Sequence, residues 1–143
     1  MIGIVKRTLF ACATLLLMAG AAQAQQTVNE CEGLKLLLQA AKDGFTQVRD
    51  YKMPGAANCT VYTDTRSYGC MWMFEKSAAA SAGYERAVHT VNSCFPNVAP
   101  KRSRSTRGTL HTEYDLGQAL IDVSRGTPGK MAGDWYSIDI IAP

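Results

Sequence analysis

Four cysteines, Cys31, Cys59, Cys70 and Cys94, constrain the fold of this chain more than any other feature of its sequence. A fifth, Cys12, lies in an N-terminal segment that we expect to be removed. In a small exported domain, an even number of cysteines indicates disulfides rather than free thiols. Four cysteines allow three pairings, and their spacing alone does not choose among them. The sequence therefore predicts two disulfides whose partners depend on the fold.

The expectation of export rests on the N-terminal segment. Two basic residues precede an apolar run over residues 8–22, and Ala24 ends a small-x-small motif of the kind that signal peptidase recognises. The run is too short to cross a membrane as a helix. We expect cleavage near Ala24, which removes residues 1–24 as a signal peptide. Residues 25–143 would then form one disulfide-stapled domain in the periplasm or outside the cell, without a transmembrane segment.

The charge of the chain argues against a nucleic-acid partner. The sequence has 15 basic and 12 acidic residues, a formal net charge of +3. Loss of Lys6 and Arg7 with the signal would lower that charge to +1. A nearly neutral domain lacks the broad positive field with which proteins attract nucleic acids. A domain of this length has a modest core, which disulfides help to stabilise.

Hydrophobic periodicity predicts two helices. Between Asn29 and about Arg49, apolar side chains recur every three or four residues. A second pattern of this kind begins at Ser77 and stops before Pro96. β-Branched and aromatic residues between turn signals predict strands. The five strands expected are residues 59–63, 70–75, 109–114, 119–124 and 135–141.

The order of these elements, α-β-β-α-β-β-β, predicts an α+β fold. We expect a two-layer sandwich, with an antiparallel sheet of about five strands and both helices on one face. If each element reverses direction, the start of the first helix meets the end of the second, which favours a Cys31–Cys94 disulfide. Cys59 can face Cys70 across the first hairpin. We predict these two pairings, with free buried thiols as the alternative.

Candidate catalytic groups are few. His111 and Glu113 alternate onto one strand face, where Asp122 or Asp139 could join them and orient the imidazole as a general base. A solvated polar cluster is the simpler interpretation, and we expect His89 on the flank of the second helix. The sequence contains no nucleophile-elbow motif and no Cys-x-x-Cys redox motif. We therefore predict no catalytic residue and a protein that is not an enzyme.

The sequence predicts no metal site and no cofactor. Its two histidines lack the spacing of a ligand pair. Met71 and Met73 share a strand face and could offer thioethers to Cu(I), but packing is the better interpretation. Residues 126–130 superficially look like a phosphate loop. They lack its first glycine and its final Ser or Thr, so we expect a turn there.

Lys101, Arg102, Arg104 and Arg107 form the most strongly charged stretch of the chain. Such a cluster could bind an acidic partner or a phosphate-bearing surface. No aromatic residue interrupts it, so it offers no stacking platform for single-stranded nucleic acid. The alternative is a flexible, solvated loop without a binding role.

One face of the predicted sheet is left without helices. If the hairpin disulfide faces the helices, alternation turns four large side chains to the opposite face: Tyr62, Met71, Met73 and Trp135. Beside them we expect two acids and two aliphatic residues: Asp122, Asp139, Leu120 and Ile141. Aromatic and methionine side chains edged by acids are typical of a protein-binding surface. A covering loop or C-terminus and a homodimer are the alternatives.

These features predict an exported, non-enzymatic protein-interaction module, such as an inhibitor, an immunity-type protector or a chaperone. Its partner would be another exported or envelope protein. The alternative is a small hydrolase or a small-ligand-binding protein that uses His111 and the neighbouring acids.

Overall fold

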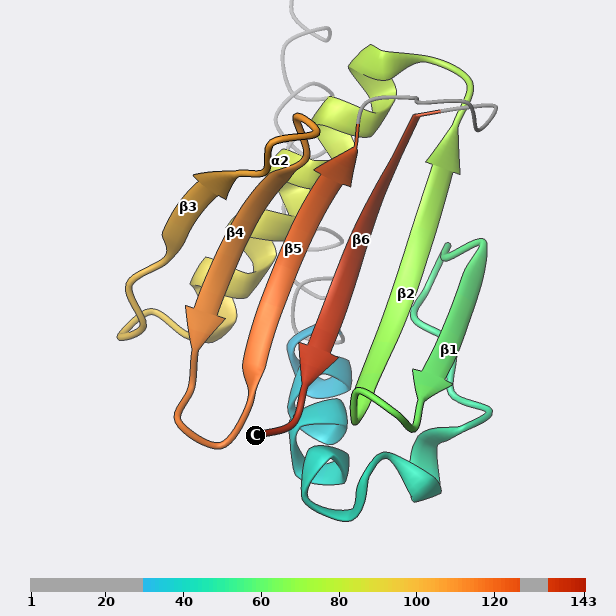
Figure 1. Cartoon of the computed structure of the whole chain (residues 1–143), viewed down its shortest axis with the longest axis vertical. Coiled ribbons are helices and arrows are strands. Elements are labelled where there is room, and N and C mark those ends of the chain that lie inside the picture. The colour runs from blue at the N-terminus through green and yellow to red at the C-terminus, as the bar shows by residue number, and fades with distance from the viewer. Residues whose placement is uncertain (1–29, 127–133) are drawn as a thin grey trace, which may run out of the picture.

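The computed structural model of the chain describes residues 30–126 and 134–143. The expected signal peptide, residues 1–24, lies outside the described residues, as does most of the turn expected at 126–130. Six strands form one sheet in which every neighbouring pair is antiparallel, in the order β1-β2-β6-β5-β4-β3 (Figure 1). The strands are β1 (Asn58–Tyr62), β2 (Ser67–Phe74), β3 (Lys101–Arg104), β4 (Leu110–Asp115), β5 (Leu120–Gly126) and β6 (Asp134–Ile141).

Two helices cover one face of this sheet (Figure 1). Residues 30–40 are helical and are followed by two short 3-10 turns, η1 (Ala41–Asp43) and η2 (Thr46–Val48). The second helix, α2 (Ser77–Cys94), packs against β6, β5 and β2. The structure thus confirms the predicted α+β fold with an antiparallel sheet. Among the described residues, no helix combines the length and the apolar character needed to span a membrane.

The first helix ends earlier than its apolar pattern predicts. Gly44 adopts the left-handed conformation (φ 70°), and its N–H and that of Phe45 donate to carbonyls of the preceding turn. These two bonds form a Schellman motif, which satisfies the free carbonyls of a helix end. The prediction of one helix up to about Arg49 is therefore wrong. Phe45 and Val48 are buried nevertheless, because the turns after Gly44 return their side chains to the core.

The sheet has a sixth strand where the sequence predicted a polar loop. Residues Lys101–Arg104 form β3, which pairs with β4 from Lys101 opposite Glu113 to Arg104 opposite Leu110. All four residues of β3 are exposed, so this strand shows no alternation of apolar and polar side chains. Such a pattern suits an edge strand beyond the helical layer, where charged residues also discourage pairing with other chains. The predicted count of about five strands is corrected to six.

Two disulfides join the elements, with the pairing that the sequence favoured. Cys59 lies directly opposite Cys70 in the β1–β2 hairpin, and the two form one disulfide. Cys31, in the first turns of the first helix, is bonded to Cys94 at the end of α2, with 5.3 Å between their Cα atoms. This second disulfide holds the two helices together across 63 residues of sequence. Disulfides are consistent with an extracytoplasmic protein.

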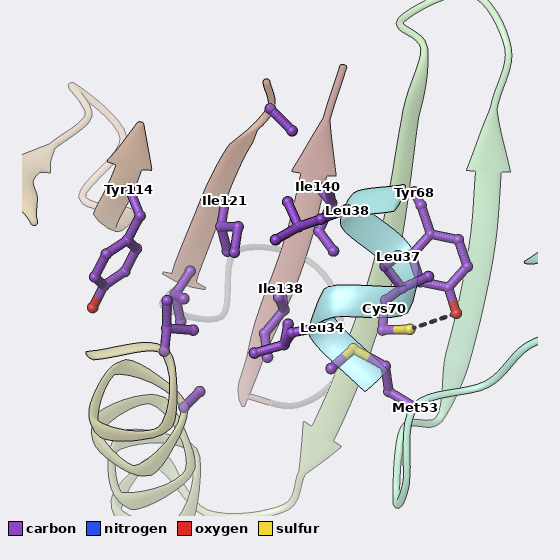
Figure 2. Close-up of a cluster of buried hydrophobic side chains, with 14 of the residues drawn as sticks. Leu34, Leu37, Leu38, Met53, Tyr68, Cys70, Tyr114, Ile121, Ile138 and Ile140 are labelled. Carbon is purple, nitrogen blue, oxygen red and sulfur yellow. Dashed lines mark hydrogen bonds between the residues drawn. The ribbon is translucent and has the colours of Figure 1, made fainter. Parts of the chain in front are cut away.

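The core lies between the helices and the sheet (Figure 2). Its central strand, β6, contributes Ile138 and Ile140, and the first helix covers them with Leu34, Leu37 and Leu38. Three buried tyrosines satisfy their hydroxyls within the core. Tyr68 donates to Tyr51 O (2.6 Å), Tyr114 donates to Val88 O (3.2 Å), and Tyr84 shares a 2.6 Å bond with Thr112 Oγ1.

Candidate functional site

The sheet face opposite the helices carries the candidate site, and we call it the open face. Side chains alternate along each strand, so the strand register sorts this face into rows that run across the sheet. Two rows cross its middle and consist mainly of polar residues. They contain Asp139, Asp122 and Glu113 in one row and Ser137, Ser124 and His111 in the other.

His111 is held by two polar partners in the middle of the open face. Its Nδ1 lies 2.9 Å from Asp122 Oδ2 and 3.0 Å from Ser124 Oγ. The Ser124 hydroxyl donates to the same Asp122 oxygen at 2.7 Å. Because the serine proton points to Asp122, the imidazole Nδ1–H is the donor toward both oxygens. This network fixes the orientation of the ring and leaves Nε2 outside it.

The geometry of this network does not match that of a nucleophilic triad. In such a triad the carboxylate and the hydroxyl contact opposite nitrogens of the histidine. Here Asp122 and Ser124 both contact Nδ1, so His111 cannot accept the Ser124 proton while Asp122 orients the ring. Glu113 shares the face but forms no hydrogen bond with His111 in the described part of the chain. Of the acids that the sequence placed near His111, Asp122 is the one that binds it.

Asp122 and Asp139 are cross-strand partners at the centre of the open face; Asp122 Oδ2 binds His111 and Ser124, and Asp139 Oδ1 lies over Gly69 of β2. Burial raises the pKa of Asp139, a hydrogen bond from Ser137 Oγ (2.8 Å) opposes this rise, and the Asp122 charge adds to it. Asp122 Oδ1 is buried and has no hydrogen-bond partner among the described residues. The centre of the open face therefore has acceptor oxygens in excess of the donors around it.

Apolar side chains lie at both ends of the open face. At one end Met73 is opposite Trp135, whose indole covers Gly126 so closely that a Cβ there would overlap it. Met71, half-buried, is the next residue of β2 on the same face. At the other end are Tyr62, Leu120 and Ile141, in one row across the sheet. Tyr62 and Met73 are each 47% exposed, and in the described part of the chain the other large apolar residue exposed in this way is Leu36 of the first helix.

This layout corrects one feature of the expected surface. The sequence predicted large apolar side chains edged by acids, whereas the register places the acids between two apolar ends. The reason is that β6 pairs with both β2 and β5, which brings Asp139 and Asp122 to the middle of the sheet. The sequence did not predict the order of the strands across the sheet, and without that order the position of the acids could not be predicted.

The four cations of the basic stretch lie at one edge of the sheet rather than in a loop. Lys101, Arg102 and Arg104 belong to β3, and Arg107 lies in the turn to β4. Alternation places Lys101 on the open face, opposite Glu113. Arg102 is on the helix side, 3.8 Å from the exposed Glu85 of α2. The basic stretch therefore does not present its cations to a single surface.

Sequence reasoning missed Ser124 and Ser137, which supply hydrogen bonds to Asp122 and Asp139. Each serine is two residues from its aspartate on the same strand, and this Ser-x-Asp or Asp-x-Ser spacing could have identified both. It also missed a cavity on the helix side of the sheet. The residues that line this cavity include His89.

Within residues 30–126 and 134–143, no three His, Cys, Asp or Glu side chains are arranged to hold a metal ion. The open face carries two aspartates, Glu113, two serines and one oriented imidazole, with Lys101 at its edge and apolar side chains at both ends. Comparison with protein-family models, with curated proteins and with solved structures finds no match to this chain.

Proposed function

We propose that this protein is an exported, non-enzymatic interaction module that binds another exported or envelope protein through the open face. The partner would insert a basic side chain, Arg in particular, between Asp122 and Asp139. Its apolar residues would pack on Met73 and Trp135 at one end and on Tyr62 at the other.

The single observation that carries this proposal is the unsatisfied centre of the open face. Buried polar atoms normally have a hydrogen-bond partner, and exceptions need an explanation. Asp122 Oδ1 has none in the described residues, and the cross-strand partner of Asp122 is a second acid, Asp139. A guanidinium has five donors in a planar fork that fits carboxylates, so one Arg side chain could satisfy both acids.

The apolar ends support the same function. Binding interfaces combine aromatic and methionine side chains with polar groups that fix orientation. Met73 and Tyr62 are exposed. The alternation of side chains along the strands places both on the open face, one on each side of the acids. A partner that neutralises the acids could also exclude water from them by covering these ends, which would strengthen the charged hydrogen bonds.

The proposal is tested by immobilising the purified protein, passing envelope extract over it, and measuring affinity for any retained protein after purification. Asp122→Asn and Met73→Asp should each weaken binding at least tenfold. The matched controls are Asp50→Asn and Lys52→Asp, exposed positions in the loop after η2, which should leave the affinity unchanged. Raised salt should weaken binding of the parent protein.

Two results would favour other functions. Self-association lost in Met73→Asp, seen by sedimentation, would identify the open face as a homodimer interface. A hydrolytic activity abolished by His111→Ala, with the fold retained, would favour the enzyme alternative.

A further inference from the structure

We propose that the cavity between the first helix, α2 and the sheet binds a small apolar molecule that carries a carboxylate. This cavity lies on the helix side of the sheet and is independent of the open face. Its volume is about 670 Å³, within the range of about 300–1,000 Å³ that small-molecule sites occupy.

The base of the cavity is apolar and rigid. Trp72 and Tyr136 are cross-strand partners whose rings stack at 4.7 Å with 5° between their planes, and Phe74 stacks on Tyr136 at 5.8 Å. The Trp72 indole also donates to Pro54 O at 3.2 Å. Aliphatic side chains complete the walls: Leu34, Met53, Val91 and Ile138. An apolar body of matching size would find ordered contacts here without rearranging the core.

The two helical walls are tied together. Next to the cavity, Thr90 Oγ1 of α2 donates to Glu30 Oε2 of the first helix at 3.1 Å. The Cys31–Cys94 disulfide bonds the same two helices. A cavity whose walls are fixed in this way is largely preformed, which lowers the entropic cost of binding.

One hydroxyl at the cavity lacks the partner that comparable hydroxyls have. The buried tyrosines Tyr68, Tyr84 and Tyr114 each form a hydrogen bond inside the core. Tyr136 is also largely buried, and its hydroxyl bonds to no other described residue, but that oxygen is not among the buried polar atoms without a partner and is therefore accessible from the cavity. Tyr136 therefore offers a donor to a ligand in the cavity.

Among the charged side chains of the rim, Glu30, Glu85 and Arg86, the guanidinium of Arg86 is the group that could hold an anion. Arg86 and Glu30 line the same cavity as Tyr136. Glu30 already accepts from Thr90, and Glu85 of the rim lies 3.8 Å from Arg102. Arg86 forms no ion pair within residues 30–126 and 134–143. The Arg86 guanidinium and the Tyr136 phenol are thus cavity groups without a partner among the described residues, and together they can hold one carboxylate.

The two tryptophans of the chain give a test that separates this site from the open face. Trp72 lines the cavity, whereas Trp135 lies on the open face. The exported, purified protein would be titrated with naphthoate, and with naphthylmethanol as the uncharged control, while both indole N–H signals are followed by NMR. Naphthoate should shift the Trp72 signal, leave the Trp135 signal in place and bind at least tenfold more tightly than the alcohol.

Variants at the rim complete the experiment. Arg86→Gln, an exposed position on α2, should weaken naphthoate binding about tenfold, and Tyr136→Phe should also weaken it. The matched control, Arg107→Gln in the β3–β4 turn, should bind like the parent. Absence of naphthoate binding would overturn the proposal, as would equal affinity for the alcohol or an unchanged affinity in Arg86→Gln. A shift of Trp135 alone would place the ligand on the open face and also overturn it.

Discussion

Asp122 and Asp139 are directly opposite each other in the register of β5 and β6, at the centre of the open face. Like charges in this cross-strand relationship destabilise a sheet. Two serines supply part of the compensation, since Ser124 donates to Asp122 and Ser137 donates to Asp139. The protein thus keeps an arrangement that costs stability at the position where we propose that a partner binds.

Replacement of Asp139 by Asn should stabilise the isolated protein at neutral pH by up to about 1 kcal/mol, because it removes one of two facing like charges. The sign follows from the pKa of Asp139, which burial and Asp122 raise above the ordinary value of 3.8. The stability that Asp139 contributes is fully present below pH 3.8, where its carboxyl group is protonated in both the folded and the unfolded state. It is lost as the pH rises through the higher pKa of the folded state. Thermal unfolding followed between acidic and neutral pH measures this loss.

In Asp139→Asn this part of the pH dependence should be absent, while the exposed control Asp50→Asn should keep it. The same variant should bind the proposed partner less tightly than the parent protein. A variant that is less stable at neutral pH than the parent would contradict the interpretation of the acid pair.

The two disulfides should contribute unequally to stability. The loop closed by Cys31–Cys94 spans 63 residues and that closed by Cys59–Cys70 spans 11. On the loop-entropy model, loss of the longer bridge costs about 4 kcal/mol and loss of the shorter about 3 kcal/mol. Denaturant unfolding of a Cys31→Ala, Cys94→Ala double variant and a Cys59→Ala, Cys70→Ala double variant measures each cost. Equal stability of the reduced and oxidised parent protein would contradict both values.

Gly83 should not tolerate a methyl group. It lies on the buried side of α2, where an added Cβ would come within 2.5 Å of the Tyr136 ring and 3.3 Å of Phe74. Alanine favours a helix over glycine by about 1 kcal/mol, but overpacking costs about 1–3 kcal/mol. We expect Gly83→Ala to destabilise the protein by about 1 kcal/mol or more. It should also displace Tyr136 and weaken naphthoate binding.

The exposed helix position Ala79 provides the comparison for Gly83. Ala79→Gly changes helix propensity alone and should cost about 1 kcal/mol without any effect on the cavity. If Gly83→Ala raised the unfolding free energy instead, the packing of Tyr136 against α2 would be looser than the structure indicates.

The sequence predicted the elements of the fold well where side-chain periodicity carries the information. The spacing of Leu34, Leu37 and Leu38 identified a buried helix face, and the hairpin disulfide followed from the positions of Cys59 and Cys70 around a turn. The pattern failed at Gly44, because buried residues on either side continue the same spacing through a helix end. It failed again at β3, because an exposed edge strand has no apolar face to reveal it.

The candidate site was predictable only in part, for a related reason. Alternation within each strand assigned Tyr62, Met73 and Trp135 to the open face. The contact between His111 and Asp122 depends instead on which strands are neighbours and on their register, and neither can be read along a single strand. The cavity depends on how the two helices pack on the sheet and on each other, which no local pattern in the chain encodes.

Alkaline pH should unfold this protein through its buried tyrosines. Burial raises the pKa of Tyr68 to about 12, with a further rise from Tyr51, and burial also raises that of Tyr136 to about 12. Below pH 10.0, the ordinary pKa of tyrosine, Tyr68 and Tyr136 are protonated in both the folded and the unfolded state, and their contribution to stability is complete. Between 10.0 and about 12 the unfolded chain ionises while the folded protein holds its protons, so stability falls as the pH rises. Phenolate absorbance and circular dichroism, recorded together, follow ionisation and unfolding.

Tyr68→Phe separates the hydroxyl from the ring. It removes the 2.6 Å bond to Tyr51 O, which should cost about 1 kcal/mol at neutral pH. It also removes one group that resists ionisation, so the fall in stability between 10.0 and about 12 should be shallower than in the parent protein. The exposed Tyr62 serves as the control for loss of a phenol hydroxyl, since Tyr62→Phe should leave the neutral stability unchanged. A parent protein whose tyrosines all ionise near 10.0 while the fold persists would show that Tyr68 and Tyr136 are less well buried than their packing implies.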